Sequence, residues 1–300
     1  MSAAREAQYP ISVVVPTVVG WPAVNLALAG ILPQLRALDG QLVVADVSRA
    51  DPPAELLDDP AVIWLRLPGE WVTRARREAY RRAGGAIVAL TEDHCVVADD
   101  WLERILAAHR RHPEAVAIAG AVANGTRRHV ADWALYLMAH AQLASPLPPA
   151  PRFVGKTNVS YRAEVLREMP DSGPASIEDL WNQQLIRGGR AVVGDDSIRV
   201  WHHQCSSPAE MIALQFHNGR TVAAARRERW VAADLLRTAL PPALAGFRTL
   251  RSLRQSLAKP LPRSMVVASL PLLGAMQLAH ALGEMIGYVR GAGDSPHHLH

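Results

Sequence analysis

Cysteine, aromatic residues and long apolar runs are all scarce in this chain. Two of its 300 residues are cysteine, Cys95 and Cys205, which excludes a disulfide framework and favours a reducing compartment. Aromatic residues make up 5% of the chain. The first ten residues contain no apolar segment, so we expect no secretory signal, and no stretch has the composition of a clean membrane span. These absences argue against a small secreted domain and against an integral membrane protein.

A strong charge of one sign is also missing, because the net charge is only +4 at pH 7. A balance this close to neutral does not indicate nucleic-acid binding. The distribution is less even, since residues 220–263 hold ten basic residues against two acids. Such a segment favours an anionic neighbour, for example lipid headgroups or phosphate.

The chain does contain enough apolar sequence for a folded core, with 49% hydrophobic and 20% charged residues. Apolar runs that predict buried strands occupy residues 11–15, 41–47, 61–67, 86–91 and 115–122. Helical patterns alternate with them at 22–38, 71–83 and 99–112, and Asp99 or Asp100 is expected to cap the last of these. This alternation predicts an α/β fold with a mainly parallel central sheet.

The composition changes after residue 145. Residues 145–152 form a Pro-rich loop, and a helix is predicted over 176–189 with its stop at Gly188-Gly189. Residues 190–205 are predicted to form a hairpin or a pair of short strands. From about residue 208 the chain is predicted to be helical to its end.

A polar cluster follows the fourth predicted strand, where Glu92, Asp93, His94 and Cys95 come directly after an apolar run. Ligands of open α/β sheets bind outside the carboxyl ends of the strands. Carboxylates suit Mg²⁺ or Mn²⁺, which in turn hold phosphate oxygens, so Asp93 is the strongest metal candidate. The alternative is a solvated turn in which Glu92 and Asp93 cap the next segment.

Two further polar clusters are simpler to explain structurally when each is taken alone. Glu178 and Asp179 open a predicted helix, where the helix dipole favours carboxylates in any case. His202 and His203 follow a predicted strand and are either ligands or the polar end of that strand. The order of all three clusters along the chain is more informative than any one of them.

That order resembles the family 2 glycosyltransferases of the GT-A fold, over residues 11 to about 230. "SVVVPT" is similar to the opening strand, whose Pro16-Thr17 loop meets the nucleotide in the family. "LVVADVSRAD" is similar to the second strand, with Asp46 in place of its first acid, Val47 in place of the second and Asp51 in place of a later one. The resemblance also puts Arg76 near the nucleotide.

The Asp-x-Asp motif of that family corresponds here to Glu92-Asp93-His94, so the last carboxylate is replaced by an imidazole, which can also bind Mn²⁺. "GKTNVSYRAEVL" resembles the acceptor-side loop and "IEDLWNQQLIRGGR" the helix that carries the general base. The resemblance then implies the following site: Asp179 as base, with Glu178 as its neighbour or as an acceptor contact; Pro16, Thr17, Asp46, Arg76, Glu92 and Asp93 at the donor; Asn158 and Trp181 at the acceptor; and Asp93, His94, His202 and His203 at the metal.

The resemblance implies an inverting transfer of a sugar from a nucleotide-sugar donor to a lipid or glycan acceptor, assisted by Mn²⁺ or Mg²⁺. We expect a GT-A catalytic domain over residues 1–215 and a basic, apolar helical segment over 216–300. No nucleic-acid partner is expected. An enzyme of this kind would act in the cytoplasm, peripheral to or partly embedded in the inner face of the cell membrane, on a cell envelope glycan.

The segment 264–289 is strongly apolar, and Pro271 is expected to interrupt any helix there. Gln277, His280 and Glu284 share one helical face. A polar stripe on an apolar helix that follows a basic segment suggests a position in the membrane interface and an anionic membrane surface as partner. The alternative is a helix that packs on the catalytic domain with this stripe outward.

Three other functions fit parts of the sequence. The departures at Val47 and His94 suggest a sugar-nucleotide-binding module without catalysis. A zinc site could draw on His94, Cys95, His202, His203 and Cys205, although no C-x-x-C pair is present. A nucleotidyltransferase would need a Gly- and Arg-rich loop, which "TVVGWPAVN" does not provide. Turnover of a sugar nucleotide separates the first two from a transferase, and pyrophosphate release would identify the third.

Overall fold

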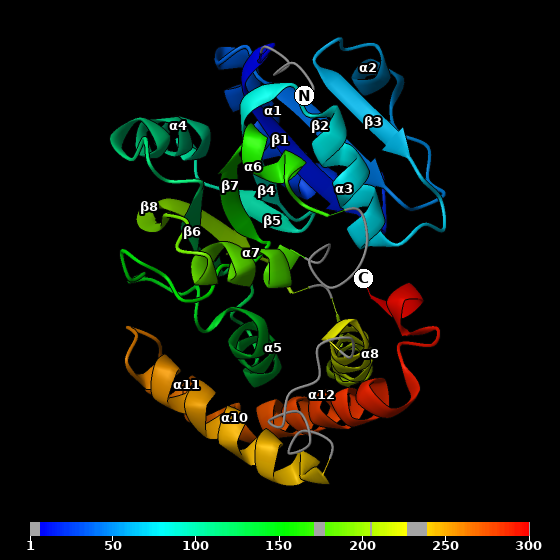
Figure 1. Ribbon diagram of the computed structural model, residues 1–300, viewed down its shortest axis with the longest axis vertical. Helices are drawn as coiled ribbons and strands as arrows, with labels where there is room; N and C mark the ends of the chain where they lie inside the picture. Colours follow the sequence, from blue (N-terminus) through cyan, green and yellow to red (C-terminus); the bar gives the residue numbers. More distant parts are fainter. Residues whose placement is uncertain (1–6, 171–177, 205, 227–238, 300) are drawn as a thin grey trace. The chain divides into compact units, whose positions relative to one another are not determined.

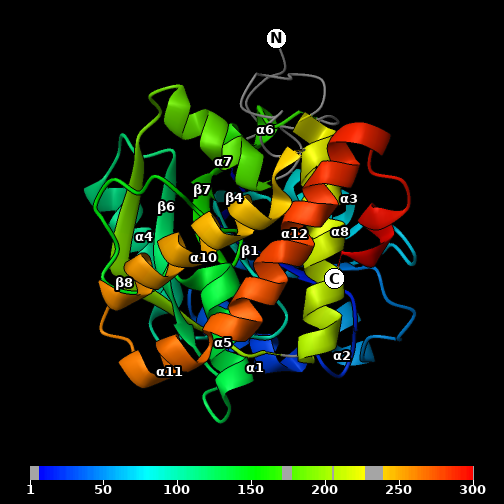
Figure 2. The same ribbon diagram turned by 90° about the horizontal axis from the view of Figure 1, so that it is seen from below.

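The computed structural model describes residues 7–170, 178–204, 206–226 and 239–299 (Figures 1 and 2). The chain divides into two compact units. The first comprises Met1–Ala123 and Pro146–Trp201, and the second comprises Asn124–Ser145 and His202–His300. The predicted boundary between residues 215 and 216 differs from this division, because the segment 124–145 packs with the C-terminal helices instead of the sheet.

The first unit is built on an eight-stranded sheet with the order β3-β2-β1-β4-β7-β6-β8-β5. The strands are β1 (Tyr9–Thr17), β2 (Gln41–Asp46), β3 (Val62–Arg66), β4 (Gly85–Thr91), β5 (Cys95–Val97), β6 (Ala117–Asn124), β7 (Asn158–Arg162) and β8 (Val192–His202). Strands β1 to β4 pair in parallel, whereas β7 runs antiparallel to both β4 and β6. All five predicted strands are confirmed, as is the mixed α/β fold.

The register of the parallel strands places their carboxyl ends together. Thr17, the last residue of β1, pairs with Asp46, the last residue of β2. Thr91 at the end of β4 pairs with Asn158 at the start of β7. Because β1 also pairs with β4, polar residues that follow these strands share one edge of the sheet.

Strand β8 differs from the predicted hairpin, since residues 192–202 form one continuous strand. The polar side chains in its middle find local partners. Asp195 Oδ1 accepts hydrogen bonds from the backbone N–H and the hydroxyl of Ser197, and Asp196 Oδ1 accepts one from the Leu147 N–H. Gly194 lets the Pro-rich loop approach closely, because its N–H bonds to the Pro149 carbonyl at 3.0 Å. Gly194 and Asp196, residue types common in turns, therefore bond to the Pro-rich loop here and do not form a turn.

The helices of the first unit are α1 (Asn25–Ala37), α2 (Ala54–Leu57), α3 (Val72–Arg82), α4 (Trp101–Arg111), α6 (Ala163–Arg167) and α7 (Glu178–Arg187). Helix α3 buries Val72, Ala75 and Ala79 at the spacing of one helical face. Asp100 precedes α4 as expected, but its side chain makes no capping bond and instead pairs with Arg104 at 2.6 Å. The chain leaves α7 at Gly188-Gly189, as predicted, with Gly189 at φ +73°.

The second unit is helical. It contains α5 (Val130–His140), α8 (Pro208–Arg226), α10 (Pro241–Leu257), α11 (Arg263–Ala268), α12 (Leu270–Arg290) and a short 3₁₀ helix (Ser295–His298). Ala134 and Leu135 of α5 pack with Leu273 and Met276 of α12. Helices α8 and α12 cross at backbone contact, because a Cβ atom added at Gly219, Gly283 or Gly287 would clash with a carbonyl of the facing helix. Glycines at these positions permit that approach.

The polar stripe of α12 is buried, which corrects both sequence-based interpretations of it. Gln277 and Glu284 are 7% and 1% exposed. Glu284 is tolerated inside because Arg248 of α10 lies 2.8 Å away and Arg226 of α8 lies 3.7 Å away. Pro271 falls in the first turn of α12, where proline is compatible with a helix. None of the helices in the described ranges has the length and apolar content that a bilayer crossing requires.

Candidate active site

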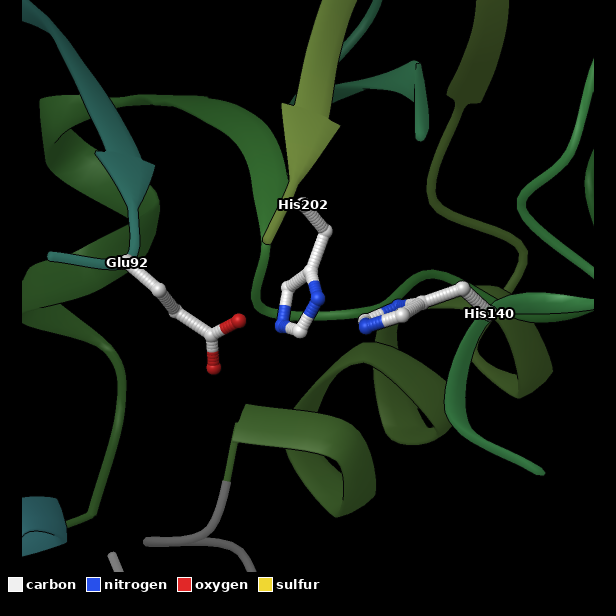
Figure 3. Close-up of side chains that lie close together, drawn as sticks. All are labelled: Glu92, His140 and His202. Atoms are coloured by element: carbon white, nitrogen blue, oxygen red, sulfur yellow. The ribbon is translucent and has the colours of Figure 1, made fainter. Parts of the chain in front are cut away.

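The acids that follow β4 are largely buried and are held by neighbouring side chains (Figure 3 labels Glu92). Thr157 donates its hydroxyl to Glu92 Oε2 at 2.9 Å, and the Lys156 ammonium lies 3.8 Å from Glu92 Oε1. His94 Nδ1 is 2.7 Å from Asp93 Oδ1. Only 14% and 12% of the Glu92 and Asp93 side chains are exposed, so a solvated turn does not describe them.

The charge state of His94 follows from these neighbours. Burial alone would lower the pKa of His94. The hydrogen bond that His94 donates to Asp93 and the charge of Glu92 outweigh that effect, so the pKa of His94 is raised. The triplet therefore combines two carboxylates with an imidazole that they polarise.

Asp179 lies in the first turn of α7 and carries a buried oxygen, Oδ1, that has no hydrogen-bond partner among the described residues. Burial raises the pKa of the Asp179 carboxyl above its usual range. The charge of Lys156 opposes this shift, and the charge of Glu178 adds to it. A buried carboxylate with an unused oxygen and a raised pKa is suited to accepting a proton.

Glu178, next to Asp179, is instead fully engaged by α3. Arg76 donates from Nε and Nη2 to the two Glu178 oxygens at 2.6 and 2.9 Å, and the Tyr80 hydroxyl is 3.3 Å from Oε1. Arg76 and Glu178 are 3% and 1% exposed. Burial would raise the pKa of Glu178, but Arg76 lowers it by more, so the pair is charged. This bidentate pair holds the start of α7 against α3.

The model of Glycosyl transferase family 2 matches residues 12–169, more than half of the chain. The chain belongs to glycosyl transferase family 2. The matched part of this glycosyltransferase runs from β1 through the Glu92-Asp93-His94 triplet to the end of α6. It stops before Glu178 and Asp179. No curated protein matches the sequence.

Solved structures with the same fold support the assignment. A mannosyltransferase from Pyrobaculum calidifontis, solved with GDP-Man and Mn²⁺, has a TM-score of 0.56 and 19% identity over 94% of this chain and 89% of that one. A mycobacterial protein has a TM-score of 0.51 and 20% identity over 75% and 76% of the two chains. GalNAc-T7, solved with UDP, GalNAc and Mn²⁺, has a TM-score of 0.50 and 16% identity over 66% and 44%. At these identities the likeness shows the GT-A fold.

The residues predicted to contact the donor in strands β1 and β2 lie at the ends of those strands, and their polar atoms support the loops that follow. Thr17 Oγ1 accepts the Gly20 N–H at 2.8 Å. Asp46 accepts the Ser48 N–H at 2.8 Å and the Trp64 indole N–H at 2.9 Å. Pro16 lies beside them in β1. Their contact with a nucleotide stays a prediction, and Arg76 is committed to Glu178.

Val47 and Asp51 occupy the positions at which the family has two further acids, and neither forms an acidic cluster with Asp46. Val47 is partly buried and packs against the core of the first unit. Asp51 is exposed and pairs with Arg66 at 2.7 Å. Of the acids in "LVVADVSRAD", only Asp46 is buried at the end of the strand.

Both acceptor candidates are buried in the first unit. Asn158 accepts the Trp101 indole N–H at 3.0 Å, and its amide donates to the carbonyls of Ala121 and Ile198 at 2.9 and 3.1 Å. These bonds assign Asn158 a role in holding the sheet together. Trp181 is 8% exposed and packs in the core, with an indole N–H that no described group accepts. An acceptor contact by either residue stays a prediction.

His202, the last residue of β8, and His203 belong to the second unit, as does a third histidine, His140, that the sequence did not single out. Figure 3 shows the His202 ring beside the ring of His140, which ends α5, and their centroids are 4.2 Å apart. His202 Nδ1 also lies 3.2 Å from the Gln204 amide, and the ring of His203 lies against Gly125. In the sequence, His140 is a single histidine in an apolar helix, which typically indicates a structural residue, so no local signal identified it.

The alternative zinc site is not supported by Cys95. Burial raises the pKa of this thiol well above its usual range, and the charge of Glu92 raises it further. Zinc binds the thiolate, so Cys95 would have to lose this proton to become a ligand. Cys205 lies outside the described residues.

Proposed function

We propose that this glycosyltransferase moves a sugar from a nucleotide-sugar donor to a lipid or glycan acceptor with inversion, and that Asp179 is the general base. The unpartnered buried oxygen of Asp179 is the observation that carries the proposal. Donors of this class are supported by the GDP-Man and the UDP in the structures of the Pyrobaculum mannosyltransferase and of GalNAc-T7.

In the proposed reaction the acceptor hydroxyl attacks the anomeric carbon while the bond from that carbon to the diphosphate oxygen breaks. The hydroxyl proton passes to the Asp179 carboxylate, and the nucleoside diphosphate leaves with the electron pair. A positioned base of this kind contributes about 10²–10⁴-fold to the rate. The raised pKa of Asp179 makes it a stronger base than an exposed carboxylate.

The side chains that follow β4 are suitable ligands for a hard divalent cation. Two largely buried carboxylates, Glu92 and Asp93, stand with the His94 imidazole within three consecutive residues. Oxygen and imidazole ligands suit Mn²⁺, and oxygen ligands suit Mg²⁺. We propose that Asp93 and His94 hold the ion, with His202 and His203 as the further ligands that the family resemblance implies. A bound cation would neutralise the charge that develops on the diphosphate.

We assign Glu178 a positioning role instead of an acceptor contact. Both of its oxygens accept hydrogen bonds from Arg76, and with 1% of the side chain exposed a substrate hydroxyl has no access to them. Because Asp179 is the next residue in the same helical turn, the ion pair fixes the place from which the base acts. Lys156 balances the charge of Glu92 and of Asp179 nearby.

The full chain can be assayed against GDP- and UDP-sugars with and without Mn²⁺, by release of the nucleoside diphosphate. We expect Asp93→Ala to abolish the metal-dependent binding of a nucleoside diphosphate in calorimetry. Asp99→Asn, which changes an exposed acid nearby, is the matched control. Unchanged affinity in a folded Asp93→Ala protein would remove Asp93 from the metal site.

A catalytically inactive sugar-nucleotide-binding module is the second candidate. The apolar Val47 and the two protein donors on Asp46 favour it, because together they leave this strand end without a free acid. The same assay separates the candidates: binding of a sugar nucleotide without turnover, with any sugar and with Mn²⁺ present, would support the module and not the transferase.

We further propose that the protein is peripheral to the inner face of the cell membrane. The basic segment 220–263 supports this, since each Lys or Arg near an anionic surface contributes about 1 kcal/mol. A lipid acceptor would be presented at the same surface.

A further inference from the structure

Helix α12 buries two polar side chains and leaves three large apolar side chains exposed on a different face. Its polar residues Gln277 and Glu284 are buried, whereas Leu278, Leu282 and Val289 on other faces are 37%, 38% and 60% exposed. A helix that faces water normally buries its apolar side. The exposed side chains form an apolar surface on α12, and such a surface favours an apolar neighbour.

Helix α10 adds exposed apolar and cationic side chains. Phe247, Leu250 and Leu257 are 63%, 46% and 40% exposed. Arg251 and Arg254 are exposed on the same side, one and two turns from Phe247, and no described carboxylate pairs with either of them. Residues 241–263 hold five basic residues and no acid. Apolar and cationic side chains therefore share one face.

An apolar groove of about 450 Å³ is lined by residues of α10 and α12. Its walls include Leu250 and Leu253 of α10 and Leu270 and Leu278 of α12. Gly246 and Gly274 keep it open, because a Cβ atom would meet nothing within 4 Å at Gly246 and only the Thr249 hydroxyl, at 4.0 Å, at Gly274. Since the exposed Leu250 and Leu278 both line it, the groove joins the two apolar surfaces.

We propose that this α10–α12 face, formed by Phe247, Leu250, Leu257, Leu278, Leu282, Arg251 and Arg254, docks on an anionic lipid bilayer, with one acyl chain in the groove. The inference rests on the membrane association proposed above and names the surface responsible for it. The apolar side chains enter the boundary between headgroups and chains, and the two arginines meet lipid phosphates. The buried stripe of α12 takes no part.

Charge decides between a bilayer and a second copy of the chain. Two copies joined through this face would bring Arg251 and Arg254 of one copy close to those of the other, and residues 241–263 contain no acid to offset them. Anionic lipid offers the opposite charge together with an apolar phase. Both features of the face are then satisfied by one partner.

The test is flotation of the full chain with vesicles of phosphatidylcholine alone or with about one third phosphatidylglycerol. We expect flotation with the anionic vesicles at low salt. Phe247→Glu with Leu278→Glu should reduce the bound fraction at least tenfold, and Arg251→Gln with Arg254→Gln should reduce it about fivefold per residue on anionic vesicles only. Gly274→Leu, which fills the groove, should weaken binding to both vesicle types. Leu57→Glu, an equally exposed leucine in α2, is the matched control.

Failure of the unmodified protein to float with anionic vesicles, or equal flotation of the Phe247→Glu/Leu278→Glu variant, overturns the proposal. If that variant is instead a monomer where the unmodified protein is a dimer in the absence of lipid, the face is a contact between copies and the proposal is wrong. Hydrolysis of a sugar nucleotide in solution should be unchanged in all of these variants. If the unmodified protein shows no transferase activity, the expected flotation results do not change. The two proposals can therefore fail independently.

Discussion

Glu178 in the first unit and Glu284 in the second are both 1% exposed and both paired with arginine, but they leave opposite surroundings. The Arg76–Glu178 pair fixes a helix start and leaves the neighbouring Asp179 with an unused buried oxygen. The pairing of Glu284 with Arg248 and Arg226 holds a polar stripe of α12 inside, while Leu278, Leu282 and Val289 of the same helix are exposed. A buried glutamate–arginine pair therefore lies next to an unpartnered carboxylate oxygen in one unit and in a helix with exposed apolar residues in the other.

The sharpest test of this comparison separates Asp179 from Glu178. Asp179→Asn should lower the rate of transfer about 10²–10⁴-fold and leave donor binding intact, because an amide keeps the shape but cannot take the acceptor proton. Single-turnover kinetics and calorimetry measure the two effects. Transfer within a few-fold of the unmodified enzyme would mean that another residue is the base.

The pH dependence of the transfer rate is a second test of Asp179. A base must be ionised, so activity should fall as the pH drops through the pKa of Asp179. Since burial raises that pKa, with Glu178 and Glu92 adding to the shift and Lys156 and Arg76 opposing it, the loss should begin at a higher pH than an exposed aspartate would give. A kcat profile that is flat down to the usual range of an aspartate would contradict this assignment.

Breaking the Arg76–Glu178 pair should lower the unfolding free energy more than breaking the Arg248–Glu284 pair. Arg76→Met leaves Glu178 charged and buried, which costs about 3–5 kcal/mol of unfolding free energy. Replacing both residues with methionine should recover much of that loss, because no buried charge remains. Urea denaturation of the two variants measures the difference. A single substitution that proves as mild as the double one would show that the pair does not hold α7.

Breaking the Arg248–Glu284 pair should lower the unfolding free energy by less. Arg248 and Arg226 are 22% and 30% exposed, so water can reach the arginines and each compensates partly for loss of the other. Arg248→Met should therefore cost about 2 kcal/mol. The same denaturation experiment checks it, and a loss as large as that of Arg76→Met would remove the distinction between the units.

The smallest effect concerns two buried neutral histidines. Burial, together with the charges of Arg248 and Arg226, lowers the pKa of His280 in the second unit to about 3. Burial and the charge of Arg162 lower the pKa of His109 in the first unit to about 4. The unfolded chain binds these protons from pH 6.5 downward, so each histidine destabilises the fold as the pH falls below 6.5, by about 1 kcal/mol at pH 5.5.

Substitution of either histidine should flatten that dependence. His280→Gln should remove its share of the slope below pH 6.5, and His109→Gln is the matched change in the first unit. Unfolding free energies from denaturation series at pH 7.0 and 5.5 provide the measurement. An unchanged slope in His280→Gln would show that this ring is already protonated in the folded protein.

The sequence determined the elements whose signals are local. The five apolar runs became strands of the sheet, the amphipathic pattern of residues 71–83 became α3, and the Gly188-Gly189 pair ended α7. The polar cluster after β4 was visible for the same reason, since a strand end and the residues behind it are adjacent in the chain. The order of these clusters was enough to indicate the family, which the match over residues 12–169 then showed.

The tertiary structure decided everything that depends on distant partners. Arg76 and Glu178 are 102 positions apart, so no local pattern tells that this glutamate is paired while the next aspartate is not. Gly194 and Asp195 carry turn signals, yet the Pro-rich loop makes them part of one strand. The 3.6-residue period placed Gln277 and Glu284 on one face of a helix, but periodicity does not say which face is covered. Only the packing of α12 against α8 and α10, with an arginine from each, turned that face inward.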